Sequence, residues 1–223
     1  MLEKDFSHAE LLAMLKNGNI PQKQLAAMKI TDVKEDESDI LISNLTGCDG
    51  KIREAVALKI NQLLQADDRY ISVFSKFHLP LAKAAIDING NICRLAIESA
   101  AILKKDSEFA EKYLSKILEY TNEAFQGLDD IDFRDRKYTV NKQLFKLYWC
   151  LEGIKLFAAD LDSEVLLPIL ERASEEREYT IREKTAQILL CKNDEKFLPL
   201  IKKLKNDENY YVRAVFDSSC NIS

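Results

Sequence analysis

The sequence has few residues that break or rigidify a chain, with only six glycines and four prolines among 223 residues. A β-protein of this length needs many tight turns, and such turns draw heavily on glycine and proline. Hydrophobic residues make up 47% of the chain and charged residues 31%, which is enough for a continuous core and a well-solvated surface. The composition therefore predicts an all-α fold of helices joined by short links.

Residues that build catalytic and metal sites are also scarce. His8 and His78 are the only histidines, and none of the five cysteines forms a CxxC pair. Most of these cysteines lie in apolar stretches that are predicted to be helical. We therefore expect the cysteines to be small buried hydrophobic residues of a protein in a reducing compartment. No Gly-rich phosphate loop, GxSxG elbow or HExxH motif occurs. We therefore expect no cofactor, no metal and no catalytic residue.

Long uncharged runs and a basic half are both missing. No stretch approaches the roughly 18 apolar residues that a membrane helix needs, and the N-terminal MLEKDFSHAELLAML does not resemble a signal peptide. The net charge is -5, whereas a nucleic-acid-binding domain typically has a pI above about 9. The sequence predicts a cytoplasmic protein without a membrane partner and disfavours nucleic acid.

What the sequence does contain is a repeat. Pro168 and Arg182 are fourteen residues apart, as are Pro199 and Arg213. In each case we expect Leu-Pro to open an apolar helix, and a β-branched residue followed by the Arg to open a second helix. The same offset joins Pro80 to Arg94 and Asp39 to Arg53. Position 141 carries Asn where an Arg is expected, and the steps between positions 53, 94, 141, 182 and 213 are 41, 47, 41 and 31 residues. These steps indicate stacked helical hairpins of HEAT or armadillo size.

We predict one domain, 1–223, of about five to six hairpins. Their approximate ranges are 6–31, 36–66, 70–104, 107–159, 163–192 and 194–223. Because one hairpin cannot bury its apolar face alone, the units must stack, and each adds a strip to an extended binding surface.

These residues resemble the HEAT-repeat family. The marks are Leu-Pro-hydrophobic in the first helix of a unit and Asp-x-x-Ile-Arg at the second, present as Asp49 to Arg53 and in weaker form before Arg182 and Arg213. The resemblance implies a right-handed superhelix with second helices lining a concave surface. It also implies that Arg53, Arg94, Arg182 and Arg213 are structural and bind acidic or carbonyl groups at the turns. Cys93 then occupies a β-branched position.

The strongest candidate for partner binding is the helix predicted from about 138 to 159. It is apolar on nearly all sides, so it is either covered on both faces or open to a partner. If one face is open, Phe145 and Trp149 are the expected anchors, because aromatic residues dominate binding hot spots. Tyr210 and Tyr211 form a second, weaker patch.

Other features admit more than one interpretation. The acidic loop 129–135 lacks the Gly and the final Glu of an EF-hand, so we interpret it as solvated, with recognition of a basic partner as the alternative. The apolar C-terminal residues Val215, Phe216 and Ile222 could mediate self-association, because the last hairpin of the array has no polar capping repeat beyond it.

The leading functional prediction is a non-enzymatic module that binds a protein or peptide segment in its concave groove. The enzymatic alternative is similarity to the HEAT-like DNA glycosylases, with Trp149 beside Glu152 or Asp160. A third interpretation is similarity to the HEAT-like lyases and chaperones of bilin attachment. Only the short final repeat spacing of 31 residues, between Arg182 and Arg213, favours it.

Overall fold

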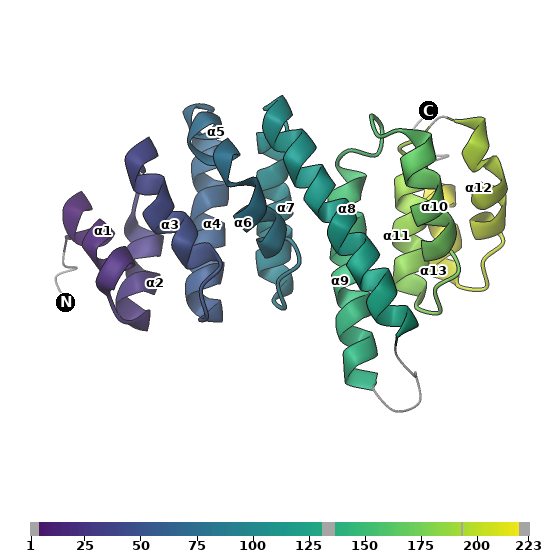
Figure 1. Cartoon of the computed structure of the whole chain (residues 1–223), viewed down its shortest axis with the longest axis horizontal. Helices are drawn as coiled ribbons and strands as arrows, with labels where there is room; N and C mark the ends of the chain where they lie inside the picture. The colour runs from purple at the N-terminus through teal and green to yellow at the C-terminus, as the bar shows by residue number, and fades with distance from the viewer. Residues whose placement is uncertain (1–4, 131–136, 193, 219–223) are drawn as a thin grey trace. The chain divides into compact units, whose positions relative to one another are not determined.

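The computed structural model describes residues 5–130, 137–192 and 194–218, and every regular element in these ranges is a helix (Figure 1). The chain divides into two compact units, Met1–Lys116 and Ile117–Ser223. The boundary falls inside the longest helix, α8 (Ser107–Asp129). We describe each unit by itself.

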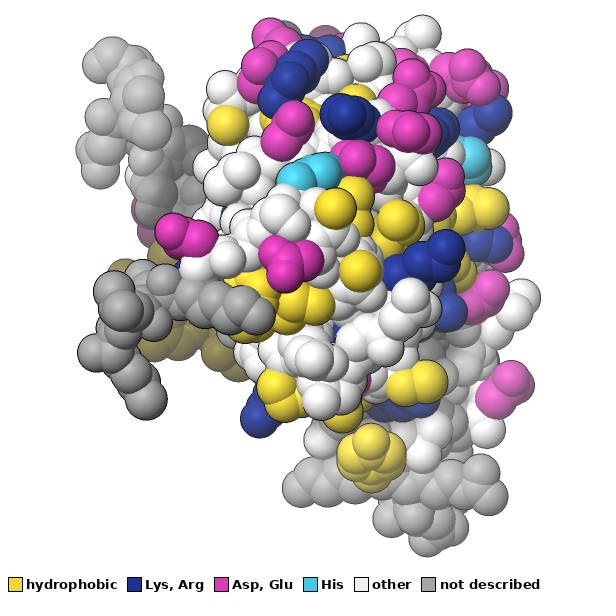
Figure 2. All heavy atoms as spheres, turned by 90° about the vertical axis from the view of Figure 1, so that its left-hand side faces the viewer, with side chains coloured by type: hydrophobic (Ala, Val, Ile, Leu, Met, Phe, Trp, Pro, Cys, Tyr) yellow, Lys and Arg dark blue, Asp and Glu magenta, His cyan; other side chains and the backbone are white. Residues whose placement is uncertain are grey.

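Unit one, Met1–Lys116, is an array of antiparallel helices in two layers. Its helices are α1 (His8–Asn17), α2 (Ile20–Lys29), α3 (Ser38–Leu45), α4 (Gly50–Ala66), α5 (Arg69–Phe74), α6 (His78–Ala84) and α7 (Gly90–Leu103). α2 packs against α4 and α4 against α7, whereas α1 packs against α3 and α3 against α6. We call α2, α4 and α7 the second-helix layer of this unit and α1, α3 and α6 its first-helix layer. Figure 2 views the α1 end, where hydrophobic side chains lie exposed among polar ones.

The helices of unit one begin where side chains cap them. Ser7 accepts a hydrogen bond from the Glu10 amide and Glu10 binds the Ser7 amide in return, as the sequence pattern predicts. Asp49 caps α4 by accepting from the amides of Lys51 and Ile52. The Asp49 carboxylate thus satisfies two of the amides at the start of α4 that have no partner within the helix.

The segment after α4 forms two short helices around Pro80. It is divided into α5, a 3-10 turn at Ser75–Phe77 and α6, with Pro80 in the first turn of α6. Proline is tolerated there because the first amides of a helix lack internal acceptors. Residues 69–103 therefore contain three helices and a 3-10 turn, whereas residues 38–66 contain two helices.

Unit two, Ile117–Ser223, repeats the layered arrangement. It contains the C-terminal part of α8 together with α9 (Lys137–Lys155), α10 (Ser163–Ala173), α11 (Tyr179–Leu189), α12 (Leu198–Lys205) and α13 (Tyr210–Ser218). α11 packs against both α9 and α13, which form the second-helix layer of this unit, while α10 and α12 belong to its first-helix layer. Leu170, Phe197 and Leu204 of the first-helix side and Ile181 and Ile188 of α11 are all fully buried in the core of this unit.

The two prolines of unit two take different positions. Pro199 lies in the first turn of α12, as the Leu-Pro pattern predicts. Pro168 lies inside α10, five residues after the helix begins at Ser163, so the prediction that it opens a helix is wrong. The N-terminal cap is supplied instead by Asp162, which accepts from the Glu164 amide.

The cysteines divide into two classes. Cys93 and Cys150 are buried, as expected, and burial raises the pKa of the Cys150 thiol to about 12 despite a hydrogen bond with Thr121. Cys48 and Cys191 are exposed, which corrects the expectation of burial. Cys48 lies in the turn between α3 and α4, and Cys191 lies two residues after the end of α11, so neither is inside a packed helix. Cys220 lies outside the described residues.

Two searches of the described residues concern membranes and metals. Within residues 5–130, 137–192 and 194–218, no helix combines the length and apolarity needed to cross a bilayer. The same ranges hold no group of three or more His, Cys, Asp or Glu side chains placed to share a metal ion.

Candidate binding surface on the second helices

Arg182 joins two consecutive hairpins of unit two. Its Nε and Nη2 atoms donate to the two carboxylate oxygens of Asp207 at 2.7 and 3.0 Å, while Nη1 donates to the carbonyls of Glu176 and Arg177. The side chains of Arg182 and Asp207 are only 9% and 8% exposed. This bidentate hydrogen bonding lowers the pKa of Asp207 although burial opposes it. We call this arrangement of one Arg, a neighbouring Asp and two turn carbonyls the arginine clamp.

Arg53 makes the same clamp in unit one. It donates to Asp87 at 2.7 and 3.1 Å and to the carbonyls of Gly47 and Cys48, both at 2.9 Å. Each clamp thus binds the turn of its own hairpin and an Asp in the turn of the next one. Arg213, in the last hairpin described, binds only the turn carbonyls of Asp207 and Glu208.

Arg94 does not belong to this set, and its assignment as a structural repeat position is wrong. It is an exposed residue that pairs with Glu98 one turn along α7, at 2.7 Å. Cys93 takes the clamp position instead, with its thiol donating to the Asp87 carbonyl at 3.0 Å. The reason is the spacing from the helix cap. Arg53 lies four residues after its cap, Asp49, and Cys93 lies four residues after Asn89, whereas Arg94 is one residue further on.

The aromatic cluster of α9 is partly open. Phe145 is 39% exposed and meets the half-buried Trp149 edge to face, with ring centroids 6.1 Å apart. Tyr148 also meets Trp149 edge to face, with ring centroids 5.3 Å apart. The Trp149 Nε1 atom is buried and has no hydrogen-bond partner among the residues that the structure describes. Phe145 is therefore the more accessible of the two predicted anchors, and the half-buried Trp149 packs against its ring.

A charged cluster adjoins these aromatics. Glu152, one turn after Tyr148, forms ion pairs with Lys184 of α11 and with Lys155, the latter at 3.0 Å. Burial raises the pKa of Glu152, but the two lysines outweigh that effect and keep it below its usual value. Lys184 also lies over the Tyr148 ring at 4.9 Å. Glu152 is therefore an ionised, paired carboxylate.

A second aromatic group lies at the start of α13. Tyr210 and Tyr211 are 65% and 60% exposed, with ring centroids 5.7 Å apart. Tyr179 of α11 stacks on Tyr211 at 5.8 Å, so the group extends over two neighbouring second helices. Phe216, which sequence analysis offered for self-association, is buried at 4% exposure. It packs into the core of its own unit, and Ile222 lies outside the described residues.

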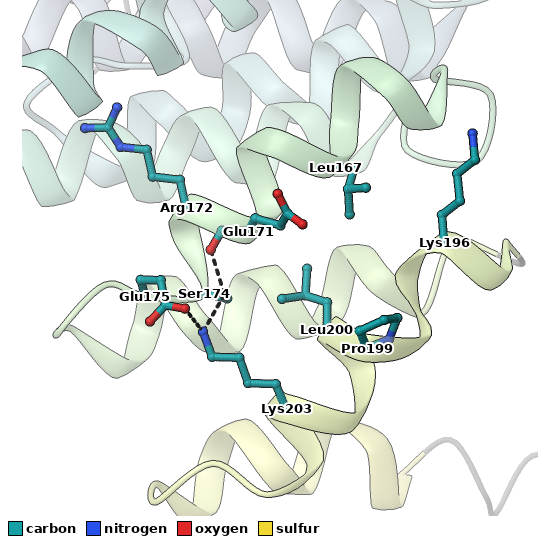
Figure 3. Close-up of a pocket in the computed structure, with 9 residues that line it drawn as sticks. All are labelled: Leu167, Glu171, Arg172, Ser174, Glu175, Lys196, Pro199, Leu200 and Lys203. Atoms are coloured by element: carbon teal, nitrogen blue, oxygen red, sulfur yellow. Dashed lines mark hydrogen bonds and ion pairs between the residues drawn. The ribbon is translucent and has the colours of Figure 1, made fainter.

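The first-helix layer of unit two contains a cavity of about 450 Å³ between α10 and α12 (Figure 3). Leu167, Leu200 and Pro199 form its apolar part. The lysines at its rim are already paired, Lys196 with Glu164 and Lys203 with Glu175. The positive charges of both lysines at the rim are therefore balanced by glutamates. The sequence analysis did not predict this cavity.

The acidic loop is described only at its beginning. Asp129 pairs with Arg172 at 2.5 Å, and Arg172 also donates to the Phe125 carbonyl and covers the Phe125 ring. Residues 131–136 lie outside the described part of the chain. At its described end, the loop thus carries an acidic side chain that binds a cation of its own unit.

Comparisons with known proteins place the fold. No family model matches the chain, and no curated protein matches it either. Among solved structures, the chain is similar to a designed armadillo repeat protein in complex with the peptide (KR)4, with a TM-score of 0.58 and 12% identity over 96% of this chain and 98% of that one.

A second similar structure is one of a group of computationally designed armadillo repeat proteins for modular peptide recognition. It has a TM-score of 0.54 and 13% identity over 96% of this chain and 98% of the other. At such low identity the likeness shows the fold alone. Together with the layered hairpins, it shows that the chain has an all-α helical repeat fold of the armadillo-like type.

Proposed function

We propose that this protein is a non-enzymatic, cytoplasmic interaction module that binds a protein or peptide segment on the exposed side of α9, α11 and α13. The proposal includes a HEAT-like origin for its two-helix units. We call this surface the second-helix face of unit two. The observation that carries the proposal is the exposure of Phe145 on α9 and of Tyr210 and Tyr211 on α13, the two helices that pack on either side of α11 in one layer.

Large aromatic side chains are favourable anchors because they bury much apolar area while losing little conformational entropy. The similar designed proteins support the proposal, since one is described with a bound peptide and another as made for peptide recognition. The arginine clamps fix the turns and leave the outer side of the second helices to contact a partner.

The glycosylase alternative gains no support from the site. Its acid would be Glu152 beside Trp149, but two lysines already bind that carboxylate. Asp160 lies in the exposed turn after α9. Nothing in the described residues favours the bilin-lyase alternative.

The test compares two surfaces of unit two. Wild type and two double variants are each immobilised and exposed to native lysate, and the captured proteins are compared. The aromatic variant carries Phe145→Ser and Tyr211→Ser, and the control variant carries Val165→Ser and Leu198→Ser. The control removes apolar side chains that are 43% and 57% exposed on the first-helix layer. A captured protein is then purified and its dissociation constant measured with all three.

We expect the aromatic variant to weaken binding by at least about tenfold, as removal of one hot-spot residue does, and the control to leave it unchanged. Circular dichroism verifies that both variants are folded. Binding that is retained by the aromatic variant and lost by the control would move the site to the first-helix layer and refute the proposal.

A further inference from the structure

The cavity between α10 and α12 contains one charge that no other described residue balances. Each cationic side chain of the lining pairs with a carboxylate: Arg172 with Asp129, Lys196 with Glu164, and Lys203 with Glu175. Glu171 is the remaining charged residue of the lining. Its carbonyl accepts from the Ser174 hydroxyl, but its carboxylate has no hydrogen bond or ion pair with any residue that the structure describes. The lining and its ion-pair partners therefore carry one net negative charge.

The Glu171 carboxylate lies beside an aliphatic surface. Leu167 precedes Glu171 by four residues on α10, so the two side chains share one face of that helix. On the other side of the cavity, α12 contributes Pro199 and Leu200 to the lining. Figure 3 shows the Glu171 carboxylate next to Leu167, whereas the Arg172 guanidinium points away from the space between Leu167 and Leu200. The unbalanced carboxylate and the apolar part thus belong to one cavity.

Ion pairs border this cavity at both ends. Lys196 and Glu164 pair near the starts of α12 and α10, and Lys203 binds Glu175 and the Ser174 hydroxyl near the opposite ends of these helices (Figure 3). The apolar part lies between the two pairs. A volume of about 450 Å³ suits a ligand of small-molecule size.

We propose that this cavity binds a small organic monocation, a protonated amine with an apolar body. The ammonium group pairs with Glu171, and the body packs against Leu167, Pro199 and Leu200. The site goes beyond the proposed function, because it belongs to the first-helix layer and takes a small molecule. An anion fits less well, since every cation of the lining already has a carboxylate partner. A neutral apolar molecule would cover the aliphatic surface but gain nothing from the carboxylate.

The probes are three molecules that share one apolar body and differ in charge: phenylbutylamine, phenylbutanol and phenylbutanoate. Each is titrated into the isotope-labelled full chain at low salt, and chemical-shift changes of the backbone amides give the dissociation constants. A solvent-accessible ion pair contributes modestly, so we expect the amine to bind about three- to fivefold more tightly than the alcohol. The carboxylate should bind most weakly. The largest shifts should fall in residues 167–175 and 199–203, which line the cavity.

Three variants test the role of each part. Glu171→Gln should remove the preference for the amine over the alcohol, because it deletes the charge and keeps the shape of the side chain. Glu195→Gln is the matched control and should retain the preference, since Glu195 is also exposed in unit two but lies outside the lining. Leu167→Ser should weaken binding of all three probes and leave their order unchanged, because it removes apolar surface and no charge. Circular dichroism verifies that the variants are folded.

Four results would overturn the inference: no probe shifts the cavity amides of wild type, the alcohol binds as tightly as the amine, Glu171→Gln retains the wild-type preference, or Glu195→Gln abolishes it as well. The double variant with Phe145→Ser and Tyr211→Ser keeps this test separate from that of the second-helix face of unit two. We expect this variant to bind the amine like wild type, because its substitutions lie on the other layer. Loss of amine binding would place the amine on the aromatic side chains and refute the cavity site, whereas unchanged protein capture would refute only the proposed function.

Discussion

The arginine clamp of unit two should be the most consequential polar interaction in that unit. The change is Arg182→Met, which preserves the length of the side chain and removes its charge and donors. The variant leaves Asp207 buried without its cation and removes the donor to two turn carbonyls. Removing one partner of a buried ion pair costs about 3–5 kcal/mol, and the bidentate geometry places this pair among the stronger ones.

The matched control is Lys196→Met, also in unit two. The ion pair between Lys196 and Glu164 has side-chain exposures of 53% and 72%, and such surface pairs contribute about 0.2–1 kcal/mol. Urea unfolding is followed by the fluorescence of Trp149, the single tryptophan, which reports on unit two. With a slope of about 2 kcal/mol per molar urea, a loss of about 3 kcal/mol lowers the midpoint by about 1.5 M, against less than about 0.5 M for the control.

A double-mutant cycle with Asp207→Asn separates the pair from the turn contacts. Asparagine keeps an acceptor for the Asn209 amide, which binds Asp207 at 2.8 Å, so the single variant loses mainly the charge. We expect a coupling energy of about 1–3 kcal/mol between the two positions. If Arg182→Met shifts the urea midpoint no more than Lys196→Met does, the clamp does not hold the hairpins together and our reasoning is wrong.

Three further predictions follow from individual residues. Because the folded-state pKa of Asp207 is lowered by its bond to Arg182, its stabilisation is present above its unfolded pKa of about 3.8 and is lost as the pH falls below that value. The stability difference between wild type and Asp207→Asn should therefore shrink between pH 4 and pH 2 in urea titrations, and a constant difference would contradict this. Iodoacetamide followed by peptide mapping should label the exposed Cys191 in the native protein and Cys150 only after unfolding; native labelling of Cys150 at an equal rate would show that it is not buried. Gly18→Ala places a Cβ 2.4 Å from a backbone carbonyl oxygen of α1 and should cost about 1–3 kcal/mol. Gly127→Ala, inside α8, meets the flexible side chain of Gln143 on α9, which can shift, and should be neutral or stabilising by up to about 1 kcal/mol. Thermal melts that rank the two glycine variants in the opposite order would refute the comparison.

The features that could be predicted from the sequence are those set by residues close together in the chain. The Ser7–Glu10 capping box follows from the Ser-x-x-Glu pattern and the helix start at Pro199 from the Leu-Pro pattern, and both patterns involve only a few neighbouring residues. The repeat itself was visible because the same short pattern returns around Arg53 and Arg182. The partner of each arginine was not visible, since Asp87 and Asp207 lie 34 and 25 residues further along the chain.

The error at Arg94 shows why matching residue types is weaker than counting from a helix cap. The fourteen-residue offset from Pro80 led to Arg94, but Pro80 does not occupy the same place in its helix as Pro168, which lies deep inside α10. A cap fixes the rotation of the following helix, because it sets where the first turn begins. Counted from Asn89, the clamp position is Cys93, and a thiol there can donate to one carbonyl but cannot bind the next hairpin.

The binding surfaces were the hardest feature to predict from the sequence, because the exposure of a side chain depends on how neighbouring helices pack. Phe145 and Trp149 are one turn apart on α9, yet the first is exposed and the second has a buried indole nitrogen. Lys51 and Lys59 are both lysines of α4, and their helical positions differ by about 80°, yet Lys51 is exposed and Lys59 is only 8% exposed. Nothing in the local sequence distinguishes these two lysines. Their contrast follows from the stacking of hairpins, which covers the sides of α4 that pack against neighbouring helices and leaves another side open.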